Sequence, residues 1–554
     1  MSFTFTRGLG TGEVSRLERF LECVPAILSW TVIVGLLLLT VFQPVIAALL
    51  VIAFVFSWLV RMLYSNILLG VSFVRLRAER DTDWMKRLRA MEDLESCERS
   101  LTRSLHGKPF YERMSLKSHL REVRALMREP AQPPSWKAIR HLVIIPIARE
   151  GREIFEPGIA QMTRSRFPSE HIVVIFAVEG RAGDEVKRNA QAVRRAWRRK
   201  FLDFLVVIHP DGVPGEARVK GANATCAAKA GAAWCAKHGV ALENVIVSCF
   251  DADTVVSPDY FSCLTYQFVA CPDRARASFQ PIPVYQNNFW EAPAFARILD
   301  VGSTFSQLTQ STDPAALVTF SSHSMSFKAL VEIGYWPVDL ISDDSSIYWK
   351  AYVHYHGRYT VVPMLVTVSM DLAQDVSWWK TVSNTYRQRR RWAWGVEGFP
   401  IVVMAFLRDH LIPLGARLKQ GFRLLQAHVS WATWPFLLTI MTWLPAPFIA
   451  LGRSHSVVRY SEPRILSTMF NLAIVGFILS AVLSQIFLPR QKGKPHIGKR
   501  LLHVLEWLLV PPISIVFGGL PALDAQTRMA FGKRLGFWVT RKARKRKPAA
   551  RSQA

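Results

Sequence analysis

Apolar stretches near both ends of the chain enclose a central region in which short apolar runs alternate with polar segments. The first stretch contains no Asp, Glu, Lys or Arg from residue 23 to residue 60. As a single helix it would extend over roughly 57 Å, about twice the thickness of the hydrocarbon core of a bilayer. Because Gln43-Pro44 lies near its middle, the pattern predicts two membrane helices, at about residues 24–42 and 44–60.

The carboxyl-terminal part carries four further apolar stretches. Residues 429–451 and 465–488 are long enough to span a bilayer, whereas residues 399–407 are too short and are expected at the membrane surface. Residues 501–520 are also long enough, but Pro511-Pro512 interrupts them. We therefore predict a broken, re-entrant or interfacial segment there, followed by a cytoplasmic tail.

Basic residues are concentrated beside the apolar stretches. The chain has 69 Lys and Arg against 42 Asp and Glu, a formal net charge of +27. Arg16 and Arg19 precede the first predicted span, Arg61 follows the second, and no Lys or Arg lies between the two. The positive-inside rule therefore places both ends of this pair in the cytoplasm. Basic borders of this kind fit anionic membrane lipids, so we expect no nucleic-acid partner.

The distribution of charged residues and cysteines disfavours a transporter and a zinc site. A transporter typically carries polar or charged residues inside its spans, and the first two predicted spans have no charged residue. The seven cysteines are scattered, without the paired spacing of a zinc site. A reducing cytoplasmic environment accounts for them most simply.

In the central region the pattern changes to strands that alternate with helices. Residues 141–148, 171–178, 203–208 and 244–250 are short, apolar and rich in β-branched side chains. Helix-length segments with polar faces separate them. This alternation predicts an α/β domain with a mainly parallel sheet.

Two carboxylates follow the last of these strands. Asp251 and Asp253 come directly after the apolar run 245–250, and residues two apart on a strand face the same side. Open α/β sheets bind ligands at this carboxyl end. Two hard oxygen donors there suit a divalent cation that bridges phosphate oxygens. An acidic turn that merely closes the strand has the same pattern.

Three further segments carry candidate chemistry. Lys220 and Asn223 open an alanine-rich helix, where they meet a diphosphate or form an ordinary basic cap. Asp343 and Asp344 follow an apolar turn, as a helix cap or as a general base near a metal site. The run 388–392 precedes an apolar segment and is typical of a lipid-facing flank. Spacing alone leaves these alternatives open.

Four motifs occur between the membrane segments in a fixed order: Glu179, Asp251-Ala252-Asp253, Ser342-Asp343-Asp344 and Gln388-Arg389-Arg390-Arg391-Trp392. In this order they resemble the membrane-embedded family 2 glycosyltransferases, among them the cellulose and hyaluronan synthases. The resemblance covers roughly residues 140–400 and continues more weakly through the carboxyl-terminal membrane region. It implies a GT-A-type (nucleotide-diphospho-sugar transferase) domain, cytoplasmic and inserted between transmembrane helices of a cell inner-membrane protein.

The implied activity is inverting transfer of a sugar from a nucleotide-sugar donor to a growing polysaccharide, with export of the product as a further option. The alternative is non-processive transfer to a lipid or a carrier-linked glycan. By resemblance, Glu179 contacts the nucleotide base, and Asp251 lies near the nucleotide. Asp253 binds Mg²⁺ or Mn²⁺, with Asp251 as the second candidate ligand. Lys220 is the expected partner of the diphosphate.

The resemblance also assigns the acceptor side of the site. Asp344, with Asp343 beside it, matches the general base that takes a proton from the acceptor hydroxyl. Gln388, Arg391 and Trp392 match a motif beside the diphosphate and the acceptor sugar. The chemistry agrees, since Arg391 would stabilise charge on the leaving group and Trp392 offers an apolar face to a sugar ring.

Three departures leave the donor sugar and the acceptor open. Ser342-Asp343 replaces Thr-Glu, Glu179 replaces the commoner Asp, and Ser322-His323-Ser324 replaces a glycine-containing turn. The predicted organisation follows the chain as a cytosolic amino terminus (1–22), two transmembrane helices (23–61), a charged amphipathic helical connector (62–139), the GT-A-type domain (140–398), interfacial helices (399–425), a membrane region (426–522) and a basic cytosolic tail (523–554).

Overall fold

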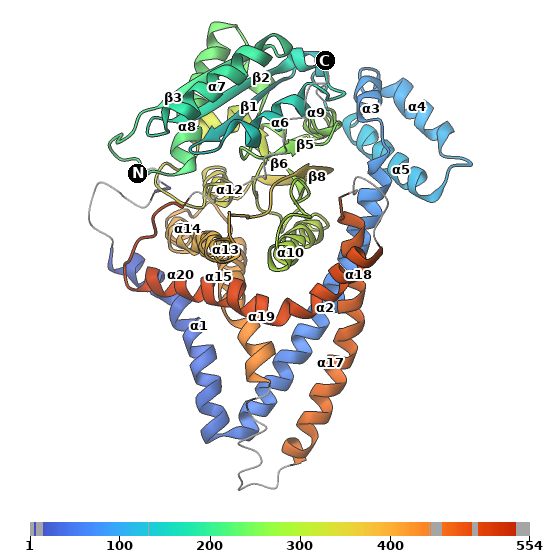
Figure 1. The fold of residues 1–554 in the computed structure, drawn as a ribbon. Helices are drawn as coiled ribbons and strands as arrows, with labels where there is room; N and C mark the ends of the chain where they lie inside the picture. Colours follow the sequence, from blue (N-terminus) through green and yellow to red (C-terminus); the bar gives the residue numbers. More distant parts are fainter. Residues whose placement is uncertain are drawn as a thin grey trace, which may run out of the picture.

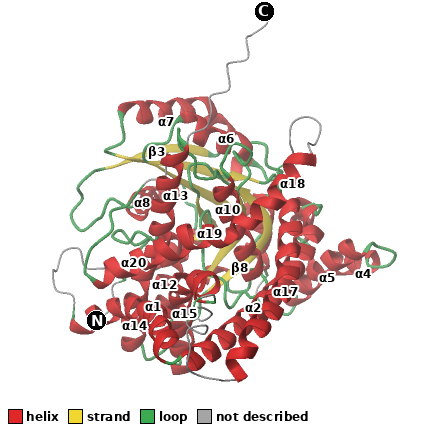
Figure 2. Cartoon of the chain, turned by 60° about the horizontal axis from the view of Figure 1, so that its bottom comes forward, coloured by secondary structure: helices red, strands yellow, loops and turns green. Residues whose placement is uncertain are grey.

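A computed structural model describes residues 5–6, 15–130, 132–442, 444, 457–489 and 497–538 of the protein. A sheet and its covering helices form one end of the molecule, and long helices project from the other (Figure 1). Figure 2, turned so that the bottom of Figure 1 comes forward, shows the strands behind helices of the carboxyl-terminal half.

The sheet has eight strands in the order β3-β2-β1-β4-β7-β6-β8-β5. Pairs among β1–β4 and the β6–β8 pair are parallel, whereas β7 and the edge strand β5 run antiparallel to their neighbours. The four predicted strands are confirmed with ends that agree within one residue. The bounds are β1 Arg140–Ile147, β2 Ile172–Glu179, β3 Asp203–His209, β4 Val245–Cys249, β5 Val255–Val256, β6 Ala277–Val284, β7 Ser324–Ser326 and β8 Thr360–Ser369.

Helices cover both faces of the sheet, which is why β2 is buried along its whole length. One face packs against α6 (Arg152–Met162), α7 (Asp184–Trp197) and α9 (Tyr260–Ala270). The other face packs against α8 (Lys220–Lys237) and α12 (Asp343–His354). Both α8 and α12 begin at the carboxyl edge of the sheet, where their first residues meet.

The amino-terminal pair of helices is α1 (Arg16–Phe42) and α2 (Pro44–Arg80), and Pro44 starts α2 as predicted. The predicted change from span to connector at residue 61 is not a helix end, because α2 continues without a break to Arg80. The connector then forms α3 (Trp84–Ala90), α4 (Leu94–Ser104) and α5 (Phe110–Leu126). Of these, α3 and α5 contact α9 of the sheet domain.

After β6, the described elements are helices apart from β7 and β8. These helices include α10 (Ala294–Gln310), α11 (Phe327–Glu332), α13 (Trp378–Ala393), α14 (Gly398–Arg408), α15 (Leu414–Phe436), α17 (Val457–Ser484), α18 (Ile497–Glu506), α19 (Val510–Ser514) and α20 (Leu520–Ala530). The short apolar stretch at 399–407 forms α14, which packs against α1, α12 and α15. Part of the predicted span 429–451 and the basic run 541–547 lie outside the described residues.

In the part of the chain that the structure describes, four helical segments are long and apolar enough to cross a membrane: Arg16–Phe42, Pro44–Arg80, Ser461–Phe487 and Leu501–Ala530. The last is interrupted by a 3-10 helical turn at Trp507–Leu509 and a π-helical turn at Ile515–Gly519. In Figure 1 the segment α18–α20 runs across α1, α2 and α17 rather than along them. This course resembles the broken segment predicted from Pro511-Pro512.

Candidate active site

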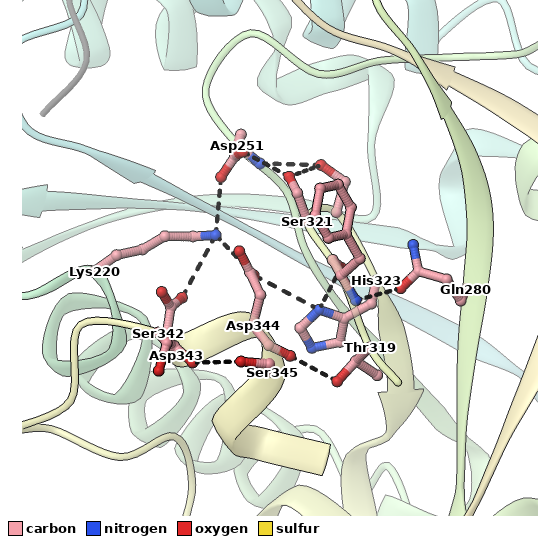
Figure 3. A network of polar contacts seen from close by, with 12 residues as sticks. Lys220, Asp251, Gln280, Thr319, Ser321, His323, Ser342, Asp343, Asp344 and Ser345 are labelled. Atoms are coloured by element: carbon pink, nitrogen blue, oxygen red, sulfur yellow. Dashed lines mark hydrogen bonds and ion pairs between the residues drawn. The ribbon is translucent and has the colours of Figure 1, made fainter. Parts of the chain in front are cut away.

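The ammonium group of Lys220 lies among three carboxylates at the carboxyl edge of the sheet (Figure 3). Its Nζ atom is 2.8 Å from Asp251 Oδ1, 3.0 Å from Asp344 Oδ1 and 3.5 Å from Asp343 Oδ2. Sequence reasoning singled out all four residues separately, and the structure brings them together.

Close backbone approach explains how these segments meet. Asp251 follows β4, Lys220 is the first residue of α8, and Asp343 is the first of α12. A Cβ atom at Gly221 would lie 2.3 Å from the carbonyl oxygen of Pro337, so only glycine lets α8 come this near to the loop before α12.

The charges of the cluster are strongly coupled. Burial alone would lower the pKa of Lys220, but Asp251, Asp343 and Asp344 outweigh it and hold that pKa well above its usual value. Burial raises the pKa of Asp343, and Lys220 offsets this only in part. Lys220 is therefore a permanent cation, whereas Asp343 takes up a proton more readily than an ordinary carboxyl group.

Hydroxyl groups from the segment before β7 hold Asp251 and Asp344 in place. Ser321 donates to Asp251 Oδ2 at 2.6 Å, and Thr319 donates to the backbone carbonyl of Asp344 at 2.6 Å. His323 Nδ1 lies 3.8 Å from Asp344 Oδ1, and burial lowers the pKa of this histidine. Ser322 has a φ of 62°, in the left-handed region that favours glycine.

Asp253 and Asp371 form a second acidic pair beside the first cluster. Asp253 is 1% exposed, and its Oδ2 accepts the backbone N–H of Asp371 at 2.6 Å. Asp371 and Asp251 line the adjoining cavity, whereas Asp253 lies behind its wall. Within the described ranges no three His, Cys, Asp or Glu side chains are grouped so that they could hold a metal ion. Sequence reasoning missed Asp371 because it did not predict β8, the strand that precedes it.

Glu179 ends β2 on the other side of the cavity, where its carboxylate accepts a bond from Arg181 Nε. This bond holds the pKa of Arg181 above its usual value. Glu179 also borders a smaller cavity of about 100 Å³, whose wall includes His209, Glu216 and Arg218. The predicted base-contacting residue therefore has a cavity on each side.

The motif on α13 turns one face to the cavity. Gln388, Arg391 and Trp392, spaced as neighbours on one helix face, line it. The two arginines between them point elsewhere: Arg389 pairs with Asp300 at 2.6 Å and Arg390 with Asp524 at 2.8 Å. The motif is thus not a lipid-facing flank, and its intervening arginines fasten α13 to α10 and α20.

A single cavity of about 880 Å³ joins these elements. It begins at Glu179 and the carboxylate cluster, passes Trp392, and reaches Arg61 on α2 and Arg423 on α15. Phe537, beyond α20, also lines it, and the guanidinium carbon of Arg391 lies 4.9 Å from the centre of that ring. Nothing in the sequence pattern around Phe537 indicated this return to the site.

Residues 246–483 match the protein family described as "Glycosyl transferase family group 2". The matched segment starts in β4 and includes Asp251, Asp253, Asp343, Asp344 and the motif of α13. Glu179 and Lys220 precede it. No curated protein sequence gives a significant match to the chain.

Solved structures of several glycosyltransferases are similar at low sequence identity. The mannosyltransferase PcManGT from Pyrobaculum calidifontis, in complex with GDP-Man and Mn²⁺, is 14% identical over 76% of this chain and 99% of its own, with a TM-score of 0.36. S. aureus TarS is 14% identical over 61% of this chain and 54% of its own, with a TM-score of 0.32. The M. tuberculosis glucosyl-3-phosphoglycerate synthase is 14% identical over 47% of this chain and 80% of its own, with a TM-score of 0.29.

The family match covers the carboxylates at the sheet edge, and the mainly parallel sheet around them has the arrangement of a GT-A domain. Residues 246–483 therefore match a family 2 glycosyltransferase domain, the fold is GT-A-like, and the protein is a glycosyltransferase.

Proposed function

We propose that the protein is an inverting glycosyltransferase that moves a sugar from a nucleotide-sugar donor to a growing polysaccharide at the cytoplasmic face of the cell inner membrane. The observation that carries this proposal is the single cavity that joins the carboxylate cluster to α2 and α15. A donor enters at the sheet end, and an acceptor reaches the same carboxylates from the membrane helices. Export of the product along the helices is a further part of the proposal.

Lys220 and Arg391 bind the donor diphosphate, and Glu179 contacts the base. Displacement at the anomeric carbon breaks the bond to the diphosphate oxygen, and the nucleoside diphosphate leaves with the electron pair. Negative charge grows on that oxygen, and fixed cations in a cavity stabilise it strongly. The pKa of Lys220, raised well above its usual value, keeps this charge available at any physiological pH.

The acidic wall fits a divalent cation by the chemistry of its donors. Asp251 and Asp371 line the cavity, and Asp253 is bonded to the backbone of Asp371, so two carboxylates of this wall face the cavity; one or two are enough for a cation whose other ligands are substrate phosphates. Hard oxygen donors are those that Mg²⁺ and Mn²⁺ prefer. Asp251 and Asp253, with Asp371 as an added candidate, would hold the ion, which would neutralise charge on the diphosphate.

Asp344 acts as the general base. It takes the proton of the acceptor hydroxyl while that oxygen bonds to the anomeric carbon on the face opposite the leaving group. Burial raises the pKa of Asp343, and the role of its carboxylate is to pair with the ammonium group of Lys220. Trp392 supports the acceptor ring by apolar contact.

A second acceptor class, a lipid or a carrier-linked glycan, is favoured by one observation. The membrane end of the cavity contains Arg61 and Arg423, which a neutral polysaccharide does not require. The two acceptors differ in product, since a synthase gives long chains and a carrier-specific enzyme gives a single addition.

The test uses purified full-length protein in detergent with a panel of UDP- and GDP-sugars, with released nucleotide and product size as the measurements. We expect one donor to be turned over and turnover to be lost in Asp344→Asn. Release of nucleotide that survives Asp344→Asn unchanged would overturn the proposal.

A further inference from the structure

His323 is a buried histidine that lies beside the carboxylate assigned above as the general base. Its side chain is 0% exposed and does not line the cavity, whereas Asp344 does. The ring atom Nδ1 is 3.8 Å from Asp344 Oδ1, and the two groups face each other in Figure 3. His323 belongs to Ser322-His323-Ser324, where the sequence departs from the glycine-containing turn of the synthases it resembles.

The backbone around His323 is fixed independently of this contact. Ser322 before it has a φ of 62°, and the carbonyl oxygen of His323 accepts the N–H of Cys249, the last residue of β4, at 3.1 Å. Four residues earlier, Thr319 donates to the backbone carbonyl of Asp344 at 2.6 Å. The segment that carries the ring is therefore tied both to the strand before Asp251 and to the residue that carries the base.

The surroundings of the ring indicate which nitrogen carries the proton. Nδ1 is 3.2 Å from the carbonyl oxygen of Phe320, which can only accept, so Nδ1 is assigned the hydrogen. Within the described ranges Nε2 is buried without a hydrogen-bond partner, and burial lowers the pKa of His323. The ring is therefore neutral. A buried nitrogen without a partner costs free energy, so packing alone does not explain a histidine at this position.

The two oxygens of the Asp344 carboxylate have different surroundings. Oδ1 accepts a hydrogen bond from the ammonium group of Lys220 at 3.0 Å and faces His323 Nδ1. In the part of the chain that the structure describes, Oδ2 forms no hydrogen bond or ion pair. One oxygen is thus held by the protein, and the other is left for a hydroxyl group that enters the cavity.

We propose that His323 is a positioning residue for the general base. Its Nδ1–H approaches Oδ1 when the acceptor binds, and together with Lys220 it holds the carboxylate so that Oδ2 faces the acceptor hydroxyl. Catalytic hydrogen bonds are often long in the absence of substrate and shorten in the reactive complex. Because the imidazole is neutral, it orients Asp344 without adding a second full cation, which would make the carboxylate a weaker base. The inference rests on the proposed function, in which Asp344 takes the acceptor proton.

Two substitutions separate the nitrogen from the volume of the ring. His323→Asn places an amide nitrogen near the position of Nδ1, whereas His323→Phe fills the space without a donor. We expect His323→Phe to lose about tenfold in turnover, the lower end of what a hydrogen bond to a charged group contributes, and His323→Asn to recover most of this loss. Affinity for UDP and GDP should remain at the wild-type value in both, because the ring does not line the cavity.

The measurements use full-length protein in detergent. Turnover is the UDP or GDP released from the sugar donor that the wild type consumes, and affinity for the same nucleoside diphosphate is measured by titration. His141→Phe is the matched control, because His141 is also a fully buried histidine but lies near the amino end of β1, away from the cavity. If His323→Phe does not fold, His323→Gln replaces it, since that amide nitrogen reaches the position of Nε2 rather than Nδ1.

Combining His323→Phe with Asp344→Asn distinguishes positioning from a purely structural role. If His323 acts through Asp344, the double variant turns over as fast as Asp344→Asn alone, whereas independent effects multiply. A multiplied loss would overturn the inference, as would equal losses in His323→Asn and His323→Phe, or a His323→Phe protein that behaves like His141→Phe. These outcomes leave the proposed function intact, whereas full turnover in Asp344→Asn would contradict the proposed function itself.

Discussion

Lys220 and Asp344 are separated by 124 positions in the chain, yet the ammonium nitrogen of one lies 3.0 Å from a carboxylate oxygen of the other. The same ammonium is 2.8 Å from Asp251, so it connects the strand that ends on the donor side with the helix that begins on the acceptor side. This bridge is the feature on which the assignment of the site depends.

Replacing Lys220 tests the bridge. Lys220→Met keeps an unbranched side chain that is one atom shorter but leaves three carboxylates without their common cation. Loss of one charged hydrogen-bonding partner is expected to weaken nucleoside diphosphate binding at least about tenfold. We also expect a lower Tm, since removing one member of a buried ion pair is strongly destabilising. Isothermal titration and thermal unfolding in detergent measure the two effects, and Lys220→Arg should restore part of the affinity. An unchanged affinity in Lys220→Met would remove Lys220 from the donor site.

The strained turn at Ser322 gives a prediction about stability. Its positive φ favours glycine, while its hydroxyl lies 2.7 Å from that of Thr254 and accepts the N–H of Asp251 at 3.4 Å. Ser322→Ala keeps the strain and loses both contacts, whereas Ser322→Gly loses the contacts and relieves the strain. The glycine variant should therefore be the more stable of the two by about 1 kcal/mol. Chemical denaturation of the two proteins would contradict this account if the alanine variant were the more stable.

Asp343 predicts how stability depends on pH. Its pKa is raised by burial in the folded state, so between the unfolded value, about 3.9, and the higher folded value the native protein binds more protons than the unfolded chain. Stability contributed by this group therefore falls as pH rises through that window and is constant above it. Asp343→Asn should remove this fall, so the gain in Tm relative to wild type should be larger at pH 8 than at pH 5. A constant difference at both pH values would contradict the shift.

Much of the sheet could be predicted because β1 to β4 are apolar runs with local signals at their ends. The strands β6 and β8 were missed, since Pro281, Pro283 and Pro363 interrupt them and proline normally argues against a paired strand. The pairing of β6 with β8 is indeed irregular at Pro281.

The residues of the candidate site could likewise be predicted only in part. Asp251 could be found because the strand and its carboxylate are adjacent in sequence. The meeting of Lys220 with Asp344, and of Arg391 with Phe537, depends on tertiary packing that no local period encodes. Helix was predicted on both sides of residue 61, but the change in charge there gave no reason to expect that the two segments form one continuous helix to Arg80.

Asp371, found only through the structure, gives a prediction about the metal. If it contributes an oxygen donor, Asp371→Ala should raise the Mn²⁺ concentration required for half-maximal turnover by about tenfold or more, in the range typical for altered metal-site partners. Asp375→Ala is the matched control, because Asp375 is four residues away and does not line the cavity. Turnover is measured after EDTA treatment and Mn²⁺ titration. Identical titrations for the two variants would exclude Asp371 from the metal site.

The central claim is that Asp344 serves the acceptor and Arg391 the donor, and one paired measurement tests it most directly. Nucleoside diphosphate affinity and turnover are determined side by side for Asp344→Asn and Arg391→Ala. We predict that Asp344→Asn loses roughly 10²–10⁴ in rate and keeps its nucleotide affinity, because Asn still offers an oxygen to Lys220. Arg391→Ala should lose both rate and affinity, and Arg391→Lys should recover only part, since lysine lacks the planar fork. If Asp344→Asn lost nucleotide binding while Arg391→Ala retained it, the two roles would be reversed and the account of the site would be contradicted.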